Sequence, residues 1–299
     1  MKHIEAIMDY YAGKTTGQLG LGFKNFKTGH AYYVAGDTRF PAASTFKVPL
    51  LIELFHQAAE GKLALTDTYT LQKEDIAPGS GLLMSLSPGV SMSILDYARL
   101  MMMISDNTAT DILFRLVGKE NILAMIQAMG LENTRGDLTC RELLFTLIGI
   151  PQDATGEEAE ALMAGGKLVP NDDLYTKFDI PNAFCSPKDM MTMLSLIYDE
   201  AILTPDACRQ MRDILAACIT NSRIPYHLPQ DGTVTVMHKT GTLPHVFNDC
   251  GIVVTPTQTY GLTIFYNRIH ASDAEKATPH FGDFLLADIS KEIYDALHR

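Results

Sequence analysis

The chain has 299 residues, of which 46% are hydrophobic, and a formal net charge of −11 at neutral pH. This length is enough for one large domain or two modest ones around a sizeable core. The acidic balance argues against a nucleic-acid partner, because Lys and Arg supply the affinity for phosphates. No apolar run approaches the roughly 20 residues of a membrane-spanning helix, so we expect no membrane anchor.

Apolar periodicity and β-branched or aromatic runs predict helices and strands along the whole chain. In chain order we expect a helix at 3–12, a strand hairpin at 19–26 and 32–34, helices at 44–59, 94–104, 109–117, 121–129, 187–198 and 205–219, strands at 233–236, 250–255 and 260–265, and a last helix at 274–297.

Strands near both ends therefore flank a helical middle, which predicts an α/β chain of the α+β type in which the two ends pair in one antiparallel sheet. We expect a discontinuous sheet domain of residues 1–36 and 187–299 and a helical domain of residues 37–186. The second domain includes an extended loop region, 131–186, in which the small and acidic residues of 151–174 form a surface insertion. The cleft between the two domains is the expected active site.

The five cysteines are odd in number and show neither a C-x-x-C pair nor a zinc-like spacing with histidine. We expect free thiols that serve as small buried groups, with no metal and no organic cofactor. No export signal is apparent, which by itself predicts a cytoplasmic protein.

Ser44-Thr45-Phe46-Lys47 is an S-x-x-K tetrad at the start of a predicted helix, where residues three apart share a face. A lysine whose pKa is lowered by burial or by a neighbouring cation can take the proton of a serine hydroxyl and make it nucleophilic. Alone the tetrad is weak evidence for a nucleophilic serine, because a helix-capping Ser44 with a solvated Lys47 fits it as well.

Two further motifs lie at the ends of predicted elements. Ser105-Asp106-Asn107 stands on a turn between two helices, and Lys239-Thr240-Gly241 ends a β-branched strand. An ordinary capping turn and an exposed strand end would explain each one separately. The order S-x-x-K, S-D-N, K-T-G is typical of class A β-lactamases and penicillin-binding proteins, and the three together make the separate explanations improbable.

The chain thus resembles that family over most of its length. The segments 41–49, 101–111 and 238–242 look like family segments, and Arg223-Ile224 with Leu228-Pro229 resembles the R-I-x-x-x-L-P run that precedes K-T-G. The resemblance implies a β-lactamase/transpeptidase-like fold, with an antiparallel sheet flanked by helices and an all-helical lobe. It also implies action outside the cytoplasm, so a periplasmic or secreted location is the second expectation.

The resemblance further implies a role for each motif residue. Ser44 attacks a carbonyl, Lys47 takes its proton, Ser105 relays a proton to the leaving nitrogen, and Lys239 keeps the local potential positive. Asn107 would hold the amide side chain of the substrate, and Thr240 with Arg223 its carboxylate. Gly241 lets the substrate approach the strand, and the backbone N–H groups of Ser44 and Thr242 would form the oxyanion hole.

The region 131–186 is some thirty residues longer than in a typical member and has no E-x-x-L-N motif, whose glutamate positions the deacylating water in that family. Possible substitutes are the acidic residues of this region, although such residues usually lie on a solvated surface: Glu157, Glu158, Glu160, Asp172, Asp173 and Asp179. His238 and His245 flank the K-T-G strand, but neither has an evident acidic partner in the sequence, so we expect no catalytic histidine.

We therefore expect a monomeric serine hydrolase of β-lactamase type that takes a small-molecule substrate, a β-lactam or a cell-wall-like peptide. Two alternatives stay open. One is a penicillin-binding D-alanyl peptidase or esterase that releases β-lactams slowly, and the other is a ligand-binding homologue without catalysis. The retention of all three motifs weighs against the second of these.

Overall fold

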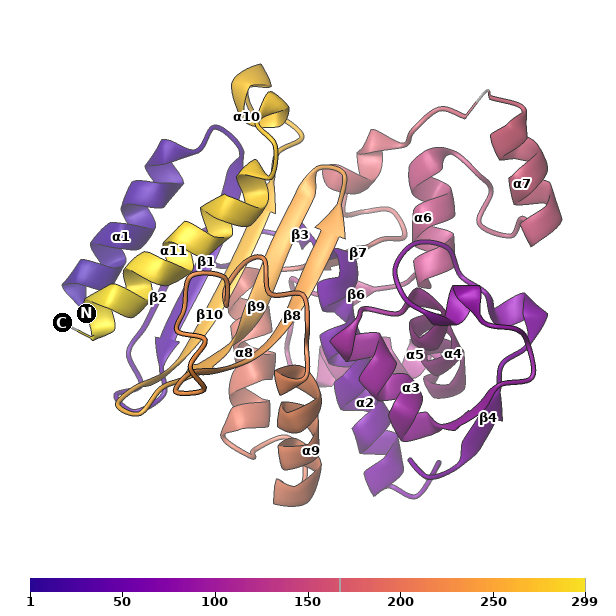
Figure 1. Cartoon of the computed structure of the whole chain (residues 1–299), viewed down its shortest axis with the longest axis horizontal. Helices are drawn as coiled ribbons and strands as arrows, with labels where there is room; N and C mark the ends of the chain where they lie inside the picture. Colours follow the sequence, from indigo (N-terminus) through magenta and orange to yellow (C-terminus); the bar gives the residue numbers. More distant parts are fainter. Residues whose placement is uncertain (167, 299) are drawn as a thin grey trace.

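The computed structural model describes residues 1–166 and 168–298 and is built around a five-stranded antiparallel sheet (Figure 1). Its strand order is β2-β1-β10-β9-β8. The bounds are β1 Gln18–Asn25, β2 Ala31–Val34, β8 Thr235–Leu243, β9 Val246–Val254 and β10 Thr259–Asn267. The first and last strands in the chain pair directly, from Gln18 opposite Asn267 to Asn25 opposite Tyr260. The expected α+β architecture with paired chain ends is confirmed.

Helices α1 (Lys2–Lys14) and α11 (Phe281–Leu297) cover one face of the sheet (Figure 1). Ile4 and Met8 of α1 pack with Ile289 and Ile293 of α11 in one apolar core. Each buried aliphatic side chain of this size contributes about 1.5–3 kcal/mol of hydrophobic stabilisation. The two terminal helices therefore anchor both ends of the chain on the sheet.

The opposite face of the sheet packs on α8 (Pro187–Tyr198) and α9 (Pro205–Ala216), and beyond these lies a group of helices from the middle of the chain. That group consists of α2 Lys47–Ala59, α3 Ile94–Met103, α4 Asn107–Val117 and α5 Lys119–Ala128. Helix α2 is buried nearly all round, which explains why its sequence is apolar on every side. Its first residue, Lys47, belongs to the first motif and lies in the interior between the sheet and these helices.

The region 131–186 contains more regular structure than the expected loop. It holds β6 (Arg135–Gly136), α6 (Cys140–Ile148), α7 (Gly156–Ala164) and β7 (Ala183–Cys185), and β7 pairs with both β6 and β3 (Phe40–Pro41). Each of the two helices begins with a capping box, in which a threonine and a glutamate three positions later satisfy each other's backbone N–H groups. This pairing ties the region to the segment that precedes the first motif.

The largest differences from the expected element boundaries lie in β8 and in the last helix. The strand expected at 233–236 is β8, which extends to Leu243 and contains all of K-T-G. The last helix is interrupted after α10 (Asp273–Ala277), and Pro279 explains the break because it cannot continue a helix. The division into two domains at residues 37 and 187 remains a prediction. No helix within the described residues is both long and apolar enough to cross a membrane.

Candidate active site

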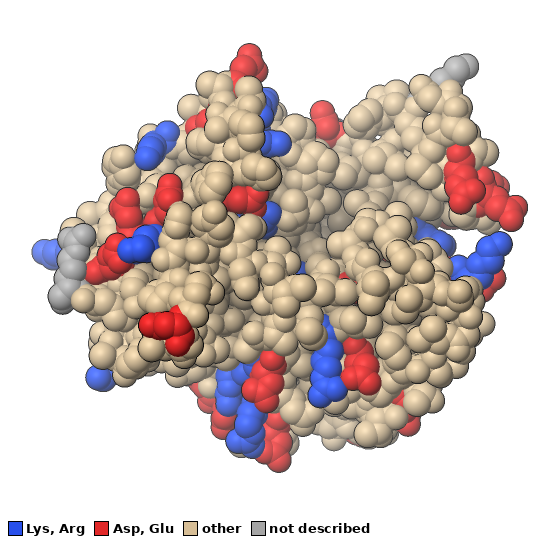
Figure 2. Space-filling model, in the orientation of Figure 1, with Lys and Arg blue, Asp and Glu red and all other residues tan. Residues whose placement is uncertain are grey.

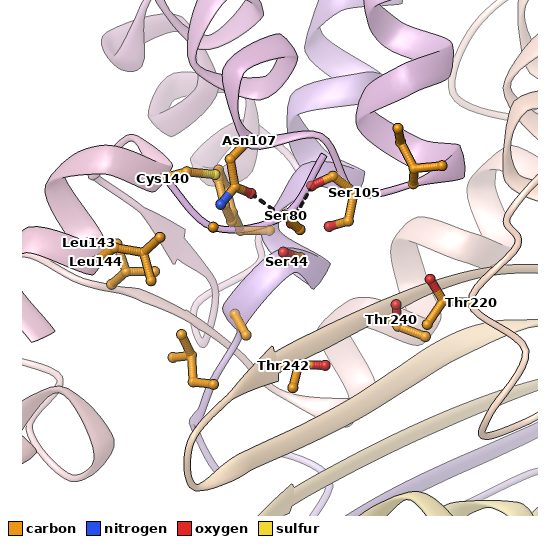
Figure 3. Close-up of a pocket in the computed structure, with 15 residues that line it drawn as sticks. Ser44, Ser80, Ser105, Asn107, Cys140, Leu143, Leu144, Thr220, Thr240 and Thr242 are labelled. Atoms are coloured by element: carbon orange, nitrogen blue, oxygen red, sulfur yellow. Dashed lines mark hydrogen bonds between the residues drawn. The ribbon is translucent and has the colours of Figure 1, made fainter. Parts of the chain in front are cut away.

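The three motifs meet at a cavity of about 270 Å³ between β8 and the helical part. Figure 2 shows the surface recess between these two parts, and Figure 3 shows the polar side chains that converge there. The polar lining residues are Ser44, Ser80, Ser105, Asn107, Cys140, Thr220, Thr240 and Thr242, and the apolar ones include Phe46, Ile104, Leu143, Leu144 and Leu243. The expected cleft is present, and it contains a hydroxyl from each of the three motifs.

Ser44 lies in a single 3₁₀ turn, Ala43–Phe46, directly before α2. The turn is held from both sides, because the Thr45 hydroxyl donates to the carbonyl of Ala42 (2.7 Å) and Asn248 Nδ2 donates to the same carbonyl (3.0 Å). Ala43 has φ +45°, in the left-handed region that non-glycine residues seldom adopt. Such strain persists only where the surroundings enforce it and clusters at functional sites, so it fits a serine presented for reaction.

Lys47 is the first residue of α2 and is completely buried. Its ammonium donates to the Ser105 carbonyl (2.8 Å), to the Ser105 hydroxyl (3.0 Å) and to Asn107 Oδ1 (2.9 Å). Three acceptors match the three protons of an ammonium. The solvated lysine that the tetrad alone would allow is therefore excluded, and Lys47 links the first motif to the second.

The S-D-N turn is fixed by Asp106, whose carboxylate accepts from the backbone N–H groups of Leu82 (2.6 Å), Leu83 (2.9 Å) and Ala109 (2.9 Å). Ser105 has φ +57°, a second strained residue in the site. A side chain on Gly81 would collide with Asp106, which explains the glycine there. These contacts aim Ser105 at the cleft.

Ser80 is a cleft residue that the sequence did not reveal. Its hydroxyl donates to the carbonyl of Ser105 (2.7 Å) and lies 3.3 Å from Asn107 Oδ1 (Figure 3). Asn107 Nδ2 in turn donates to the carbonyl of Pro78 (2.8 Å). Both polar ends of the Asn107 side chain thus have partners in the free protein, so the loop 78–81 and Lys47 hold it in place.

Lys239, on β8, approaches from the opposite side of the cleft and is also completely buried. Its ammonium donates to the Ser105 hydroxyl (3.1 Å) and to the carbonyl of Thr240 (2.8 Å). The Ser105 oxygen therefore accepts from two lysines, which occupies both of its lone pairs. Its own proton is left to donate elsewhere, and this is the arrangement that a proton relay to a leaving group needs.

Burial sets the protonation of both lysines. It lowers the pKa of Lys47, although the nearby Cys140, Asp111 and Asp106 act in the opposite direction. Burial, together with the positive charge of Lys47, lowers the pKa of Lys239 to about 7. Two ammonium groups around one hydroxyl repel each other, so one of them loses its proton more readily than an ordinary lysine.

Lys239→Met should therefore stabilise the fold while slowing acylation. The unfolded chain keeps a lysine pKa of about 10.4, so between pH 7 and 10 it binds more protons than the native protein and native stability rises with pH. Removing the buried ammonium should raise the free energy of unfolding by about 1–2 kcal/mol near pH 6.5, with the gain shrinking towards pH 10. Thermal melts of the wild type and the variant between pH 6.5 and 10 measure this gain in stability. The exposed Lys27→Met is the control. A gain that grows with pH would contradict the account.

The K-T-G strand lies directly against the turn that carries Ser44. A Cβ on Gly241 would stand 2.6 Å from the carbonyl oxygen of Ala42, 3.1 Å from Thr45 Cγ2 and 3.2 Å from Ala43 Cβ. Only glycine allows this approach, and it brings Thr240 and Thr242 to the cleft beside Ser44. Gly241 thus allows β8 to pack closely against the turn that carries Ser44.

Gly241→Ala should push β8 away from the nucleophile turn. Overpacking of this kind typically costs about 1–3 kcal/mol, and we expect at least a tenfold loss of acylation rate by penicillin together with a lower Tm. Gly13→Ala is the matched control, because its new Cβ meets nothing within 4 Å. If Gly241→Ala were acylated at the wild-type rate, the close strand contact would have no role in positioning Ser44.

Arg223 does not line the cleft but lies behind β8, almost fully buried. Its guanidinium donates to Asp283 Oδ1 (2.8 Å), to the carbonyls of Gly241 (2.9 Å) and Asn248 (2.7 Å), and to the Thr242 hydroxyl (2.7 Å). The guanidinium is therefore linked to the cleft only through the Thr242 hydroxyl. The arginine holds the end of β8 in place.

Cys140 is a second cleft residue that the sequence did not reveal. It begins α6 and lines the cleft, and its thiol is close enough to Lys47 to act on the pKa of that residue. The carboxylate of Asp111 fixes the start of the helix by accepting from the N–H groups of Cys140 (2.6 Å) and Arg141 (3.0 Å). Burial raises the pKa of the thiol to about 12, so it stays protonated at neutral pH and cannot serve as a base.

None of the six acidic residues proposed as substitutes for the missing glutamate reaches the cleft. All six are exposed, and Figure 2 shows the acidic side chains of α7 on the outer surface at the upper right. Glu158 caps α7 by accepting from the Thr155 N–H (2.8 Å), and Asp173 pairs with Lys177 (2.8 Å). The suggestion that one of them activates the deacylating water is wrong. Among the residues described as lining the cleft, none carries a carboxyl group.

The expectation that His238 lacks an acidic partner is also wrong. Its Nδ1 lies 2.8 Å from Asp249 Oδ1, and both residues are fully buried on the side of β8 that faces away from Lys239. His245 packs edge-on against the Tyr175 ring, with 5.1 Å between centroids. Neither histidine lines the cleft. No group of three metal-ligating side chains occurs within the described residues.

Comparisons with known proteins agree with this geometry. The model of the β-lactamase enzyme family matches residues 1–297. A β-lactamase structure from Sphaerobacter thermophilus superposes with a TM-score of 0.80 at 24% identity, covering 99% of this chain and 97% of that one. A variant of PBP-A, solved as an acyl-enzyme complex with penicillin G, superposes with a TM-score of 0.75 at 26% identity, covering 99% and 96%. The β-lactamase regulatory protein BlaB of Streptomyces cacaoi is 24% identical over 92% of this chain and 91% of its own length. The chain belongs to the β-lactamase enzyme family.

Proposed function

We propose that this protein is a serine acyl-transfer enzyme that is acylated at Ser44 and releases β-lactam products slowly, as a penicillin-binding peptidase or esterase does. We infer the slow release from the lining of the cleft. A buried, protonated Cys140 lies beside Lys47, and none of the residues described as lining the cleft has a carboxyl group. Of the two hydrolase functions that the sequence left open, the penicillin-binding alternative therefore takes precedence over an efficient β-lactamase.

The acylation half of the reaction uses the three motifs. Ser44 Oγ attacks the substrate carbonyl while Lys47, once it has lost a proton, takes the proton of the hydroxyl. Burial favours the neutral form of Lys47, which supports this role. The backbone N–H groups of Ser44 and Thr242 stabilise the oxyanion, and losing one such donor typically costs about 3 kcal/mol of transition-state stabilisation.

Collapse of the tetrahedral intermediate needs a proton on the leaving nitrogen. The Ser105 hydroxyl supplies it, because its oxygen accepts from Lys47 and Lys239 and its proton is free to point into the cleft. Lys239 with Thr240 attracts the carboxylate of the substrate, and Asn107 borders the side of the cleft where the amide of the substrate lies. Arg223 supports this carboxylate site through Thr242.

Deacylation needs a base that takes a proton from water. Lys47 is the remaining candidate, but it donates to three acceptors in the free protein and must lose a proton first. A flexible peptide or ester product can leave room for water beside Ser44, whereas the bulky ring fragment of an opened β-lactam blocks that side. The proposed natural substrate is therefore a D-alanyl peptide or a small ester, with β-lactams acting as inhibitors.

A competition assay tests this function. The protein should hydrolyse a D-alanyl thioester continuously, and one equivalent of penicillin G per protein should stop that hydrolysis. Rapid continuous turnover of penicillin G with only transient inhibition would instead establish a β-lactamase. No thioester hydrolysis together with no covalent penicillin adduct would leave only the binding homologue.

A further inference from the structure

The cleft has an apolar wall to which the proposed reaction assigns no role. Helix α6 turns Cys140, Leu143 and Leu144 toward the cavity, because residues three and four positions apart share one face of a helix. Figure 3 shows the two leucines on one side of Ser44 and Thr240 on the other. An acyl group attached to Ser44 therefore has an apolar surface on the α6 side.

This wall is continuous with the turn that carries the nucleophile. Ala43, which precedes Ser44, packs in one apolar cluster with Leu143 of α6 and Leu243 of β8, and Leu144 packs against that cluster. Leu243 also lines the cavity. Three separate segments of the chain thus contribute apolar side chains to the same wall.

Leu144 extends the wall to the loop 78–81. A Cβ on Gly79 would stand 3.0 Å from Leu144 Cδ1 and 2.6 Å from Asn107 Nδ2, so the leucine and the asparagine both lie against this glycine. A substrate that follows the α6 side of the cleft therefore meets aliphatic carbon as far as Asn107.

Asn107 has little hydrogen-bonding capacity left for a substrate. Its Oδ1 accepts from Lys47 (2.9 Å) and lies 3.3 Å from the Ser80 hydroxyl, and its Nδ2 donates to the carbonyl of Pro78 (2.8 Å). One N–H of the side-chain amide remains. A peptide acyl group carries both an N–H and a C=O, and burial against leucine without partners costs it the hydrogen bonds that it makes in water. An acyl chain without an amide has no such cost.

No charged side chain stands among the described lining residues of the cleft. Lys47 and Lys239 are completely buried, and Arg223 is almost so. Each of the three donates to groups of the protein itself. A charged acyl group would have to lie unpaired against the leucines, which is costly. The wall therefore favours an uncharged acyl group.

We propose that the acyl group accepted by this cleft is short, apolar and uncharged, so that the natural substrate is an ester of an aliphatic carboxylic acid rather than a D-alanyl peptide. This inference rests on the proposed acylation of Ser44 and selects one of its two substrate classes. The cavity of about 270 Å³ is smaller than the roughly 300–1,000 Å³ of sites for drug-sized ligands, which limits the length of the chain.

The reaction is an ester hydrolysis in two steps. Ser44 Oγ forms a bond to the ester carbonyl carbon while Lys47 takes the serine proton, and the bond from that carbon to the alcohol oxygen breaks as Ser105 gives this oxygen a proton. Water then cleaves the acyl-serine ester, and Ser44 regains its proton. The products are a carboxylic acid and an alcohol, and Leu143 and Leu144 hold the acyl chain throughout.

A series of p-nitrophenyl esters tests the preference on the wild-type protein. Each buried CH₂ group favours binding by about fourfold, so kcat/KM should rise at least fivefold from acetyl to butyryl and again from butyryl to hexanoyl. The p-nitrophenyl monoester of adipic acid matches the hexanoyl chain in length but ends in a carboxylate, and it should react at least tenfold more slowly. A flat or falling series, or equal rates for these last two esters, would overturn the proposal.

Leu144→Asn tests the wall itself, because asparagine is close to leucine in size but polar. The variant should lower the ratio of hexanoyl to acetyl kcat/KM at least fivefold. Leu162→Asn is the matched control, since Leu162 is exposed on α7, and it should keep the wild-type ratio. An unchanged ratio in Leu144→Asn would contradict a role of the α6 wall in binding the acyl chain.

Ser44→Ala and penicillin G separate this proposal from the proposed function. Hydrolysis of the hexanoyl ester should be lost in Ser44→Ala, and if it persisted, the ester would be cleaved elsewhere and the proposal would be wrong. If penicillin G labels Ser44 but the ester series is flat, the acyl preference fails and the proposed acylation stands. If penicillin G leaves no adduct and no ester is cleaved, both fail.

Discussion

Ser44→Ala should abolish covalent labelling by penicillin. The cleft holds the hydroxyls of Ser44, Ser80 and Ser105, but only that of Ser44 stands at the start of α2, on the strained turn beside Lys47. Ser105 already accepts from two lysines, which suits proton transfer better than attack. Intact-protein mass spectrometry after incubation with penicillin G should show one added mass in the wild type and none in the variant.

Ser80→Ala is the matched control for this prediction. Ser80 lines the same cleft, and its hydroxyl donates to the Ser105 carbonyl. The variant should still be labelled to one equivalent, at a rate reduced only by the loss of that hydrogen bond. Stoichiometric labelling of Ser44→Ala, or an adduct that maps to Ser80 or Ser105, would refute the assignment of the nucleophile.

Cys140→Glu should convert a persistent acyl-enzyme into one that turns over. The position lines the cleft next to Lys47, and a new carboxylate beside that amine would favour the charged form of both groups. A positioned general base typically contributes about 10²–10⁴-fold, so we expect release of the penicilloyl group to accelerate at least 100-fold. Decay of the adduct, followed by mass spectrometry after removal of free penicillin, measures this rate.

Cys140→Gln provides the control, since glutamine matches glutamate in size but cannot accept a proton. It should leave the acyl-enzyme as long-lived as in the wild type. If both variants released the product equally fast, the added rate would come from a change in packing. If neither did, the absence of a carboxyl group at position 140 would not be the cause of slow deacylation.

The order and spacing of the three motifs were enough to predict which motif side chains meet. Lys47, Ser105 and Lys239 are joined by hydrogen bonds although 192 positions of chain separate the first from the last (239 − 47), because S-x-x-K opens a buried helix and K-T-G lies on a sheet strand. The hairpin at the N-terminus and the helices of the middle are also confirmed. Local periodicity predicts such elements because each buries one continuous apolar face.

The region 131–186 was harder to predict, because its helices are short and tertiary contacts hold them. The sequence does contain a start signal for each of the two helices. Thr139 with Glu142 and Thr155 with Glu158 are capping boxes, which mark helix starts. The place of Cys140 beside Lys47 depends instead on the pairing of β6 with β7, which no local pattern reveals.

The partner of His238 was missed for a similar reason. Asp249 stands opposite Thr240 on the neighbouring strand, two positions along from the residue opposite His238. Such a diagonal pair follows only from the register of β8 and β9, and a shift of one residue would place the two side chains on different faces. The sequence indicated the chemistry of individual residues, but it did not indicate the long-range register of the strands.

The central claim is that Ser44 is acylated quickly and released slowly, and a time course with a chromogenic cephalosporin tests it most directly. Colour release and intact mass should be recorded on the same sample. We predict a burst of one equivalent of colour, followed by almost no further release, while a stable adduct on Ser44 accumulates to full occupancy. Sustained colour release with little adduct at any time would contradict the account and would establish an efficient β-lactamase.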